Sequence, residues 1–431
     1  MQIHVVSPGE TLQAIARQYN QAPGLIARFN ALTAPYTLAV GQALVILDIT
    51  RTYQVQAGDT LDGLARANGL SPVQLLQRNP NLAGQTALYP GQTLVLELGE
   101  TPLREIQVSG YAYPYVNPAV LRGILPYATY LIPFTYGIRL DGSLVELRDE
   151  PLIALAREYG ALPLMHLSTL TENDSFSTSR AELVFQNPAL AARLRQQVVE
   201  QIQQRGYEGL DIDFEFLGAD NAQDYVNFVA QMRAAVNALG YELIVALAPK
   251  TYADQPGLLY QGHSYPDLAA AADGVLLMTY EWGYTYGPPM AVAPLPSVRR
   301  VLDYAVTEMS PSKILMGFPN YGYDWTLPFR PGSTRADSIS NEYAVQLAVR
   351  YRAEIRFDET AQTPYFNYLD ASGAAHEVWF EDARSAQAKL ELVAEYGFRG
   401  IGVWNFMRPF VQGWAVLQSL YTVAKLPSAL G

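Results

Sequence analysis

Glu208-Gly209-Leu210-Asp211-Ile212-Asp213-Phe214-Glu215 is an apolar stretch that carries carboxylates at alternate positions. Read as a β-strand, it places Asp211, Asp213 and Glu215 on one face and the apolar side chains on the other. The Cα atoms of neighbouring acids on that face would lie roughly 6–7 Å apart. A solvated surface strand is the alternative, but residues 207–216 are too apolar for it. Because buried acids are costly unless they are paired, protonated or functional, this face predicts a functional site.

The overall composition is that of a globular protein with a large core. The chain has 431 residues, of which 49% are hydrophobic and 16% charged, which allows two or three domains. A net charge of −12 and the lack of any Lys/Arg-rich run argue against nucleic-acid binding. Disulfides and thiolate chemistry are excluded because the sequence has no cysteine. The four histidines lack metal-binding spacing, so neither a metal nor a cofactor is expected.

The N-terminal residues bear on the location of the protein. They enter a folded pattern at once and leave no room for a classical signal peptide. No apolar run reaches 18 residues, so no membrane span is expected. Three explanations are open: action inside the producing cell, delivery without a classical signal, or a mature form.

The first hundred residues contain an internal repeat. A spacing of 49 positions separates Gly9 from Gly58 and Asn30 from Asn79. Each copy is predicted to form strand, helix, helix and strand, with closing strands at 43–47 and 93–96. A Gly-Glu-Thr or Gly-Asp-Thr turn precedes each first helix, where the threonine is a suitable N-cap. The predicted domains are residues 1–48 and 51–98, and the short linkers indicate that they lie close to the rest of the chain.

This repeat resembles LysM modules in the Gly-Glu/Asp-Thr-Leu turn, the central Asn and the Gly-Gln turn. The resemblance implies binding to polymers that contain N-acetylglucosamine, such as peptidoglycan or chitin. In each copy it places the glycan between the first strand–helix loop and the second helix–strand loop. The second loop is segment 30–33 in the first copy and segment 79–82 in the second. The implied glycan-binding residues are Gly9, Glu10, Thr11, Leu12 and Asn30, and Gly58, Asp59, Thr60, Leu61 and Asn79. For any single residue among them, a purely capping or turn role is the alternative.

Residues 104–431 are predicted to form an α/β domain in which strands and helices alternate. The predicted strands are 106–111, 130–136, 162–167, 209–214, 242–248, 274–279, 314–318 and 400–404. The clearest predicted helices are 149–159, 188–204, 222–238, 295–306 and 385–396. This order predicts a TIM (β/α)8 barrel with a small β-rich insertion at about 323–385. A doubly wound sheet is disfavoured, because no Gly-rich phosphate turn follows the first strand.

The stretch 209–215 resembles the Asp-Gly-x-Asp-x-Asp-x-Glu signature of glycoside hydrolase family 18, which comprises chitinases and related N-acetylglucosaminidases. Three other strand ends are similar to that family: Met278-Thr279-Tyr280, Gly317-Phe318-Pro319-Asn320-Tyr321-Gly322 and Gly402-Val403-Trp404-Asn405. The chain departs from the family where Glu208 and Glu281 replace the usual Asp. It departs also at 165–168, Met-His-Leu-Ser, which lacks the Ser-x-Gly-Gly of typical chitinases. The retained Asp213 and Glu215 imply glycosidase activity, and the departures imply a substrate other than ordinary chitin.

The resemblance implies retaining hydrolysis in which the substrate's own 2-acetamido group is the nucleophile. Glu215 would be the general acid and base, Asp213 would orient the acetamido group, and Asp211 would hold Asp213. Tyr280 would bind the acetamido carbonyl, and Trp404 would form the floor under the sugar. The other implied substrate-binding residues are Tyr111, Glu281, Trp282, Asn320, Tyr321 and Met278. His166 is a candidate for the mouth of the barrel or, equally, a core histidine.

Tandem LysM modules before such a barrel, together with residues 278–283 and 288–294, resemble the cortex-lytic peptidoglycan N-acetylglucosaminidases of spore-forming bacteria. The expected partner is therefore peptidoglycan or another N-acetylglucosamine-containing glycan. The expected location is the spore coat, the cortex or the cell wall. A chitinase that uses the same residues and a non-catalytic wall- or coat-binding protein are the alternatives. The oligomeric state and the endo or exo mode are left open.

Overall fold

A computed structural model of the chain describes residues 1–85, 87–171 and 176–428. The first LysM-like module, here called module 1, has the predicted order of strand, helix, helix and strand. Its elements are β1 (Gln2–Val5), α1 (Leu12–Gln18), α2 (Pro23–Phe29) and β2 (Ala43–Ile46). The two strands pair antiparallel, and Leu12, Ile15 and Ala16 on α1 form the predicted buried face.

The second module, here called module 2, repeats this order and adds one short 3-10 turn. Its elements are β3 (Ile49–Gln54), α3 (Leu61–Ala67), α4 (Pro72–Gln77), η1 (Pro80–Leu82) and β4 (Thr93–Leu98). Thr11 caps α1 by accepting a hydrogen bond from Ala14 N, and Thr60 caps α3 by accepting one from Gly63 N. Both helices therefore begin where the sequence predicts them to begin.

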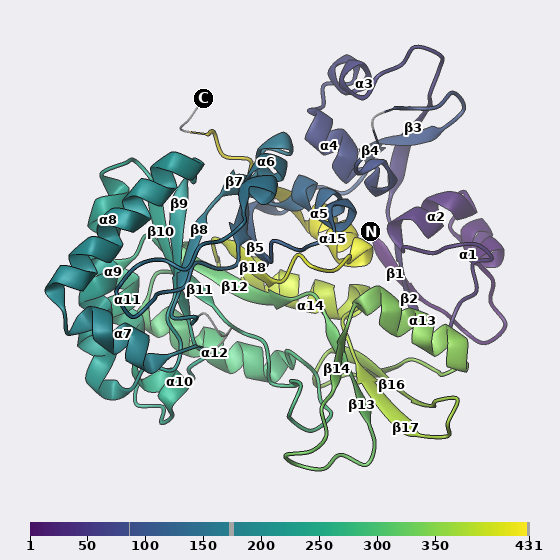
Figure 1. The fold of residues 1–431 in the computed structure, drawn as a ribbon. Coiled ribbons are helices and arrows are strands. Elements are labelled where there is room, and N and C mark those ends of the chain that lie inside the picture. Colours follow the sequence, from purple (N-terminus) through teal and green to yellow (C-terminus); the bar gives the residue numbers. More distant parts are fainter. Residues whose placement is uncertain (86, 172–175, 429–431) are drawn as a thin grey trace.

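A parallel β-barrel occupies the larger part of the chain (Figure 1). Its strands are β5 (Arg104–Ala112), β6 (Tyr130–Pro133), β7 (Leu162–Pro163), β8 (Met165–Ser168), β9 (Gly209–Asp213), β10 (Glu242–Leu247), β11 (Gly274–Leu277), β12 (Ile314–Pro319) and β18 (Gly400–Trp404). All eight predicted strand positions are occupied, and the TIM barrel is confirmed. The third position differs from the prediction, because it is split at Leu164 into β7, which pairs with β6, and β8, which pairs with β9. The short strand β19 (Tyr421–Val423) pairs with β5.

Helices surround this barrel, as Figure 1 shows. They are α5 (Pro118–Ile124), α6 (Glu150–Glu158), α7 (Thr178–Phe185), α8 (Pro188–Arg205), α9 (Ala222–Asn237), α10 (Leu258–Gln261), α11 (Tyr265–Ala271), α12 (Leu295–Glu308), α14 (Ala383–Glu395) and α15 (Val411–Leu420). Short 3-10 turns are η2 (Leu125–Tyr127), η3 (Ala219–Asn221) and η4 (Pro311–Lys313). The helix α8 has a capping residue at each end. Asn187 caps its first turn, and Gly206, with a φ of 72°, follows its last residue.

Between β12 and β18 lies a five-stranded antiparallel sheet with one helix, here called the insertion. Its elements are β13 (Gly322–Thr326), β14 (Asp337–Ile339), α13 (Asn341–Tyr351), β15 (Arg356–Asp358), β16 (Thr363–Leu369) and β17 (Ala375–Trp379). The sequence predicted the strands that became β15, β16 and β17. It did not predict β13, β14 or α13. For β13 the reason is that this strand follows the apolar end of the barrel strand β12 almost directly.

Both modules contact the barrel domain. Phe29 and Val45 of module 1 and Val95 of module 2 belong to the same hydrophobic cluster as the barrel helices. Module 1 also meets the insertion, where Ile355 N donates to Val40 O over 2.9 Å. Within residues 1–85, 87–171 and 176–428, no helix combines the length and the apolar character that a membrane span requires.

Candidate active site

The acidic strand end is built from β9 as the alternation predicts. Asp211 and Asp213 point into the barrel and are buried, while Glu215 lies two residues beyond β9 and is half-buried. Phe216 then takes a positive φ of 57°, which turns the chain away from the strand direction. The alternate side chains are fully buried in the core: Leu210, Ile212 and Phe214. The three carboxylates therefore face the axis of the barrel at the carboxyl ends of its strands.

A cavity of about 760 Å³ opens above these carboxylates. Asp213 and Glu215 form part of its wall, and most of the remaining wall is aromatic. Besides Asp213 and Glu215, six predicted substrate-binding or catalytic residues line it: Tyr111, Met278, Tyr280, Glu281, Trp282 and Trp404. Further aromatic side chains complete the wall: Tyr113, Tyr115, Phe134, Phe176, Tyr260 and Tyr323. A long aromatic cavity with a few convergent polar groups is the form of a ligand site.

Asp211 has two polar neighbours on other strands. The Tyr111 hydroxyl donates to Asp211 Oδ2 over 3.0 Å. The imidazole Nε2 of His166, which lies opposite Asp211 in the β8–β9 register, is 3.3 Å from the same oxygen and 3.9 Å from Asp213 Oδ2. Thr135 Oγ1 makes a short hydrogen bond with His166 Nδ1 on the far side of the ring. His166 thus belongs to the carboxylate cluster and is not a rim residue.

The protonation states of this cluster follow mainly from burial. Burial raises the pKa of Asp211 to about 7, although the Tyr111 hydrogen bond opposes the rise. Burial and, secondly, the charge of Asp211 raise the pKa of Asp213. Burial lowers the pKa of His166 to about 3, so its imidazole is neutral at physiological pH. The cluster therefore retains protons at a pH where exposed aspartates would have lost them.

The pKa of the Glu215 carboxyl is raised as well. Burial raises its pKa well above the ordinary value, and the charges of Asp213 and Glu281 raise it further. Loss of hydration is the larger of these causes. A carboxyl whose raised pKa favours its protonated form, in the wall of an aromatic cavity, is suited to donate a proton to a bound substrate.

A second histidine fixes the backbone between the two acids. His263 Nε2 donates to Phe214 O over 2.9 Å, and its Nδ1 accepts from Ala248 N over 2.9 Å. Because Phe214 lies between Asp213 and Glu215, this hydrogen bond holds the segment that positions both carboxyl groups. Sequence reasoning missed this role, since His263 lies far along the chain and only the β9–β10 packing brings it close.

The Glu281 carboxylate accepts hydrogen bonds from two tyrosines. The hydroxyl of Tyr323 donates to Glu281 Oε1 over 3.1 Å, and the hydroxyl of Tyr321 donates to the same oxygen. Burial raises the pKa of Glu281, and the two tyrosines oppose this rise. Tyr321, which was expected to bind substrate, therefore lies behind Glu281, whereas Tyr323 of the insertion reaches the cavity.

Asn320 requires a correction, because it was expected to contact substrate. It is fully buried, and its Nδ2 donates to Asn405 O over 3.0 Å and to Arg408 O over 2.8 Å. The amide therefore ties the end of β12 to the loop after β18. Asn320 supports the cavity from outside its wall.

The residues assigned to glycan binding in the modules divide into two groups. Asn30 and Asn79 are buried, and each exchanges hydrogen bonds with the closing strand, at Val45 and Val95 respectively. Leu12 is fully buried in the core of module 1, and Leu61 packs on that of module 2. The side chains of Asn30, Asn79 and Leu12 are therefore almost fully buried, and their part in glycan binding stays a prediction.

The turn residues remain accessible. Gly9 and Gly58 have positive φ values of 82° and 92°, as the turn requires. The carboxylate of Glu10 accepts from Ser7 N, and that of Asp59 accepts from Gln56 N, so the two acids are equivalent. Thr11 and Thr60 keep an exposed or partly exposed position beside these turns. Glu208, the unusual first residue of the signature, lies at the opposite end of β9, where Ser428 Oγ donates to it over 2.9 Å.

A (β/α)8 barrel with buried acids and a glutamate of raised pKa in an aromatic cavity has the arrangement of a glycoside hydrolase. Residues 171–408 match the family described as glycosyl hydrolases family 18, and residues 4–47 and 53–97 match the LysM domain. The chain belongs to glycosyl hydrolases family 18, and its two repeats are LysM domains. The predicted enzyme class is thereby confirmed.

Similar proteins span the whole chain. It is 39% identical to the cortical fragment-lytic enzyme of Bacillus subtilis (strain 168) over 99% of both chains. The crystal structure of the Bacillus megaterium QM B1551 spore cortex-lytic enzyme SleL is 35% identical, with a TM-score of 0.84 over 99% of both chains. A chitinase from Chromobacterium violaceum is 26% identical, with a TM-score of 0.68 over 73% of this chain and 98% of that chain.

Proposed function

We propose that this enzyme hydrolyses the glycosidic bond that follows N-acetylglucosamine in spore cortex peptidoglycan. The observation that carries the proposal is Glu215, a carboxyl of raised pKa, beside the buried Asp213 in the wall of an aromatic cavity. The named activity of the cortex-lytic relatives, which match this chain from end to end, supports the choice of substrate. The proposed domains are residues 1–48, 51–98 and 104–431, with the insertion at about 323–385.

The chemistry begins with proton donation. Glu215 donates its proton to the glycosidic oxygen, and the bond between that oxygen and the anomeric carbon breaks. The acetamido oxygen of the same sugar attacks the anomeric carbon and forms an oxazolinium ion, so the protein supplies no nucleophile. Glu215, now a carboxylate, takes a proton from water. The oxygen of that water bonds to the anomeric carbon, and the bond from that carbon to the acetamido oxygen breaks. The oxazolinium ring opens in this way, and the configuration at the anomeric carbon is retained.

Two other residues bind the acetamido group, and further residues support them. Asp213 accepts its N–H and stabilises the positive charge of the oxazolinium ion. The Tyr280 hydroxyl, which is buried in the same cavity wall, donates to the acetamido carbonyl. Asp211 holds Asp213 in place, supported by Tyr111 and His166. Trp404 offers an apolar face to the sugar ring.

The modules attach the enzyme to the glycan. The accessible turn residues Gly9, Glu10 and Thr11, and their equivalents Gly58, Asp59 and Thr60, form the proposed contact surfaces. This attachment places the enzyme at the spore cortex, the coat or the cell wall. Chitin hydrolysis is the second candidate, and the likeness to a chitinase over 73% of this chain favours it.

Mass spectrometry of parallel digests distinguishes the two candidates. Spore cortex fragments and chitin oligomers are incubated with the enzyme, and with the Glu215→Gln variant as the control. The proposal expects cortex products that carry N-acetylglucosamine at the reducing end and are absent from the control. Cleavage of chitin oligomers alone would contradict it.

A further inference from the structure

The turn before the closing strand of module 1 packs against the insertion. Ala39 is 5% exposed and belongs to the same hydrophobic cluster as Phe366, in the core of the insertion. Ile355 N, just before β15, donates to Val40 O over 2.9 Å. A Cβ atom on Gly41 would lie 1.8 Å from Ile355 O, so the two backbones meet with no room for a side chain. Module 1 is therefore part of the packing of the insertion.

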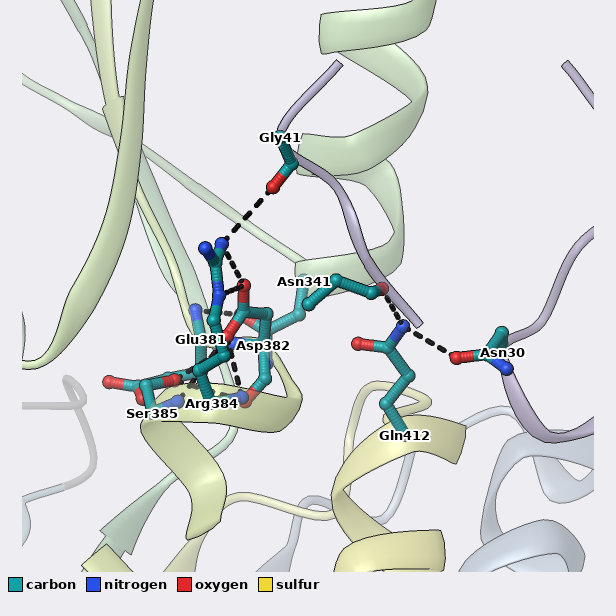
Figure 2. A network of polar contacts seen from close by, with 9 residues as sticks. Asn30, Gly41, Asn341, Glu381, Asp382, Arg384, Ser385 and Gln412 are labelled. Carbon is teal, nitrogen blue, oxygen red and sulfur yellow. Dashed lines mark hydrogen bonds and ion pairs between the residues drawn. The ribbon is translucent and has the colours of Figure 1, made fainter. Parts of the chain in front are cut away.

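One arginine side chain strengthens this contact. Arg384 Nη2 donates to Gly41 O over 3.2 Å and pairs with Asp382, the N-cap of α14, over 2.6 Å. Its guanidinium carbon lies 4.4 Å from the centre of the Phe357 ring on β15, the edge strand of the insertion sheet. Figure 2 shows Arg384 extending from the start of α14 to Gly41. Arg384 thus connects module 1, the edge strand and the helix that follows β17.

Module 2 has the equivalent turn in a different setting. Its sequence there is Tyr89-Pro90-Gly91, and all three residues are exposed. The backbone is the same, since Gly41 has a φ of 80° and Gly91 a φ of 84°. A Cβ atom on Gly91, however, would meet nothing within 4 Å. The turn is therefore a docking element in module 1 and an exposed turn in module 2.

The insertion sheet runs from this contact to the active site. Its strand order is β14-β13-β17-β16-β15, so β15 lies at the edge beside module 1. Tyr323 of β13 is paired with Trp379, the last residue of β17, and Trp379 is also paired with Tyr365 of β16. The Tyr323 hydroxyl donates to Glu281 Oε1 over 3.1 Å, and both residues line the active-site cavity. A continuous hydrogen-bonded sheet therefore connects module 1 with the wall of that cavity.

The Tyr323 contact bears on the acid chemistry of the site. Burial raises the pKa of Glu281, while hydrogen bonds from Tyr321 and Tyr323 oppose the rise. Burial, the charge of Asp213 and the charge of Glu281 raise the pKa of Glu215. Loss of the Tyr323 contact would raise the pKa of Glu281 and so reduce its charge. The pKa of Glu215 would then fall, because a less charged Glu281 repels the Glu215 carboxylate less.

We propose that module 1 is a positioning element of the active site, in which residues 39–41 and Arg384 hold the insertion so that Tyr323 meets Glu281. Arg384 is a positioning residue, since it acts through the insertion sheet and touches no substrate. The inference rests on the proposed function, because it takes Glu215 as the acid that Glu281 influences. It gives module 1 a role in hydrolysis that module 2 does not share.

Two pairs of full-length variants test the proposal. Gly41→Ala forces module 1 away from Ile355, and Gly91→Ala is its matched control, because it strains the same turn without that contact. Arg384→Ala weakens the contact from the other side. Its control is Arg28→Ala, which removes an arginine that joins module 1 to module 2. The two test variants alter different domains, so a folding defect in one leaves the other as the test.

Hydrogen exchange measured by mass spectrometry shows whether the contact holds the insertion. We expect amide exchange in β13 and in β15–β17 to become roughly 2–10-fold faster in Gly41→Ala and Arg384→Ala, the effect of one lost hydrogen bond. The two controls should exchange there at the wild-type rate. Wild-type exchange of β13 in both folded test variants would overturn the proposal, whatever their activity.

Steady-state kinetics on soluble spore cortex fragments test the link to the acid. In Gly41→Ala and Arg384→Ala, kcat should fall roughly 3–30-fold with a smaller change in KM. The alkaline limb of kcat/KM should move to lower pH, whereas both controls keep the wild-type profile. A limb that stays in place in both test variants would overturn the link through Glu281. A wild-type protein that leaves these fragments uncut would count against the proposed function, while the exchange experiment, which needs no substrate, would still decide the role of module 1.

Discussion

The imidazole Nε2 of His166 lies 3.3 Å from Oδ2 of Asp211, and both side chains are fully buried. Tyr111 reaches the same carboxylate oxygen from a third strand. Asp211 therefore cannot rotate without losing contacts to two other strands. Because Asp211 is held in this way, the position of Asp213, the next inward-facing acid on β9, is restricted as well.

His166→Ala is expected to lower kcat by roughly 10–100-fold with little change in KM, because Asp211 loses one of its positioning contacts. His166→Gln should recover part of the activity, since its amide can place an N–H near the same oxygen. Steady-state kinetics across pH give the check. A positioning role shifts the pH profile of kcat in the alanine variant, whereas unchanged kcat and profile would rule it out.

Glu281→Gln is expected to move the alkaline limb of the kcat/KM profile to lower pH. The negative charge of Glu281 helps to raise the pKa of Glu215, so its removal lowers that pKa. Glu215 then loses its proton, and its acid function, at a lower pH. The profile on a soluble oligomer measures this. A limb that stays in place or moves to higher pH would show that Glu281 does not act on Glu215 in this way.

Asp211→Asn is expected to stabilise the protein at alkaline pH. The pKa of Asp211 rises from 3.8 to about 7 on folding, so the folded state binds more protons than the unfolded state between these values. Stability contributed by the protonated form is present below about pH 4 and is lost as the pH rises through about 7. The asparagine variant lacks this loss, so its stability relative to wild type should grow by about 3 kcal/mol from pH 4.5 to pH 8.

Thermal unfolding at the two pH values measures the effect of Asp211→Asn. The exposed Asp254→Asn serves as the control and should show no such growth. The same difference from wild type at both pH values would mean that Asp211 does not titrate as described.

Asn79→Ala is expected to destabilise module 2 by about 1–3 kcal/mol, because Leu75 O and both polar groups of Val95 lose their partner. Hydrolysis of short soluble oligomers should be unaffected at a temperature where the variant is folded. Chemical unfolding, with the exposed Thr52→Ala as control, gives the comparison. An Asn79→Ala protein as stable as the control would restore the view that this amide serves glycan binding.

The sequence predicted the elements whose signal is local. Alternation within one strand revealed Asp213 and Glu215, and the 49-residue repeat revealed the modules. The cap residues Thr11 and Thr60 marked the first turn of each module helix. In each case neighbouring residues carry the whole pattern, so no tertiary information is needed.

The remaining features depend on contacts between distant segments. His166 and His263 join the site only through the register of β8 with β9 and the packing beside β10. Asn320 sits in a motif at a strand end, yet its side chain turns to Asn405 and away from the cavity.

The rate of cortex-fragment hydrolysis by Glu215→Gln, compared with wild type, tests the central claim most directly. The account predicts a loss of at least about 10²–10⁴-fold, because the amide cannot donate the proton that the leaving group needs. The variant should keep the thermal unfolding temperature and the glycan affinity of the wild type. Turnover close to the wild-type rate by a correctly folded Glu215→Gln protein would contradict the assignment of Glu215 as the acid.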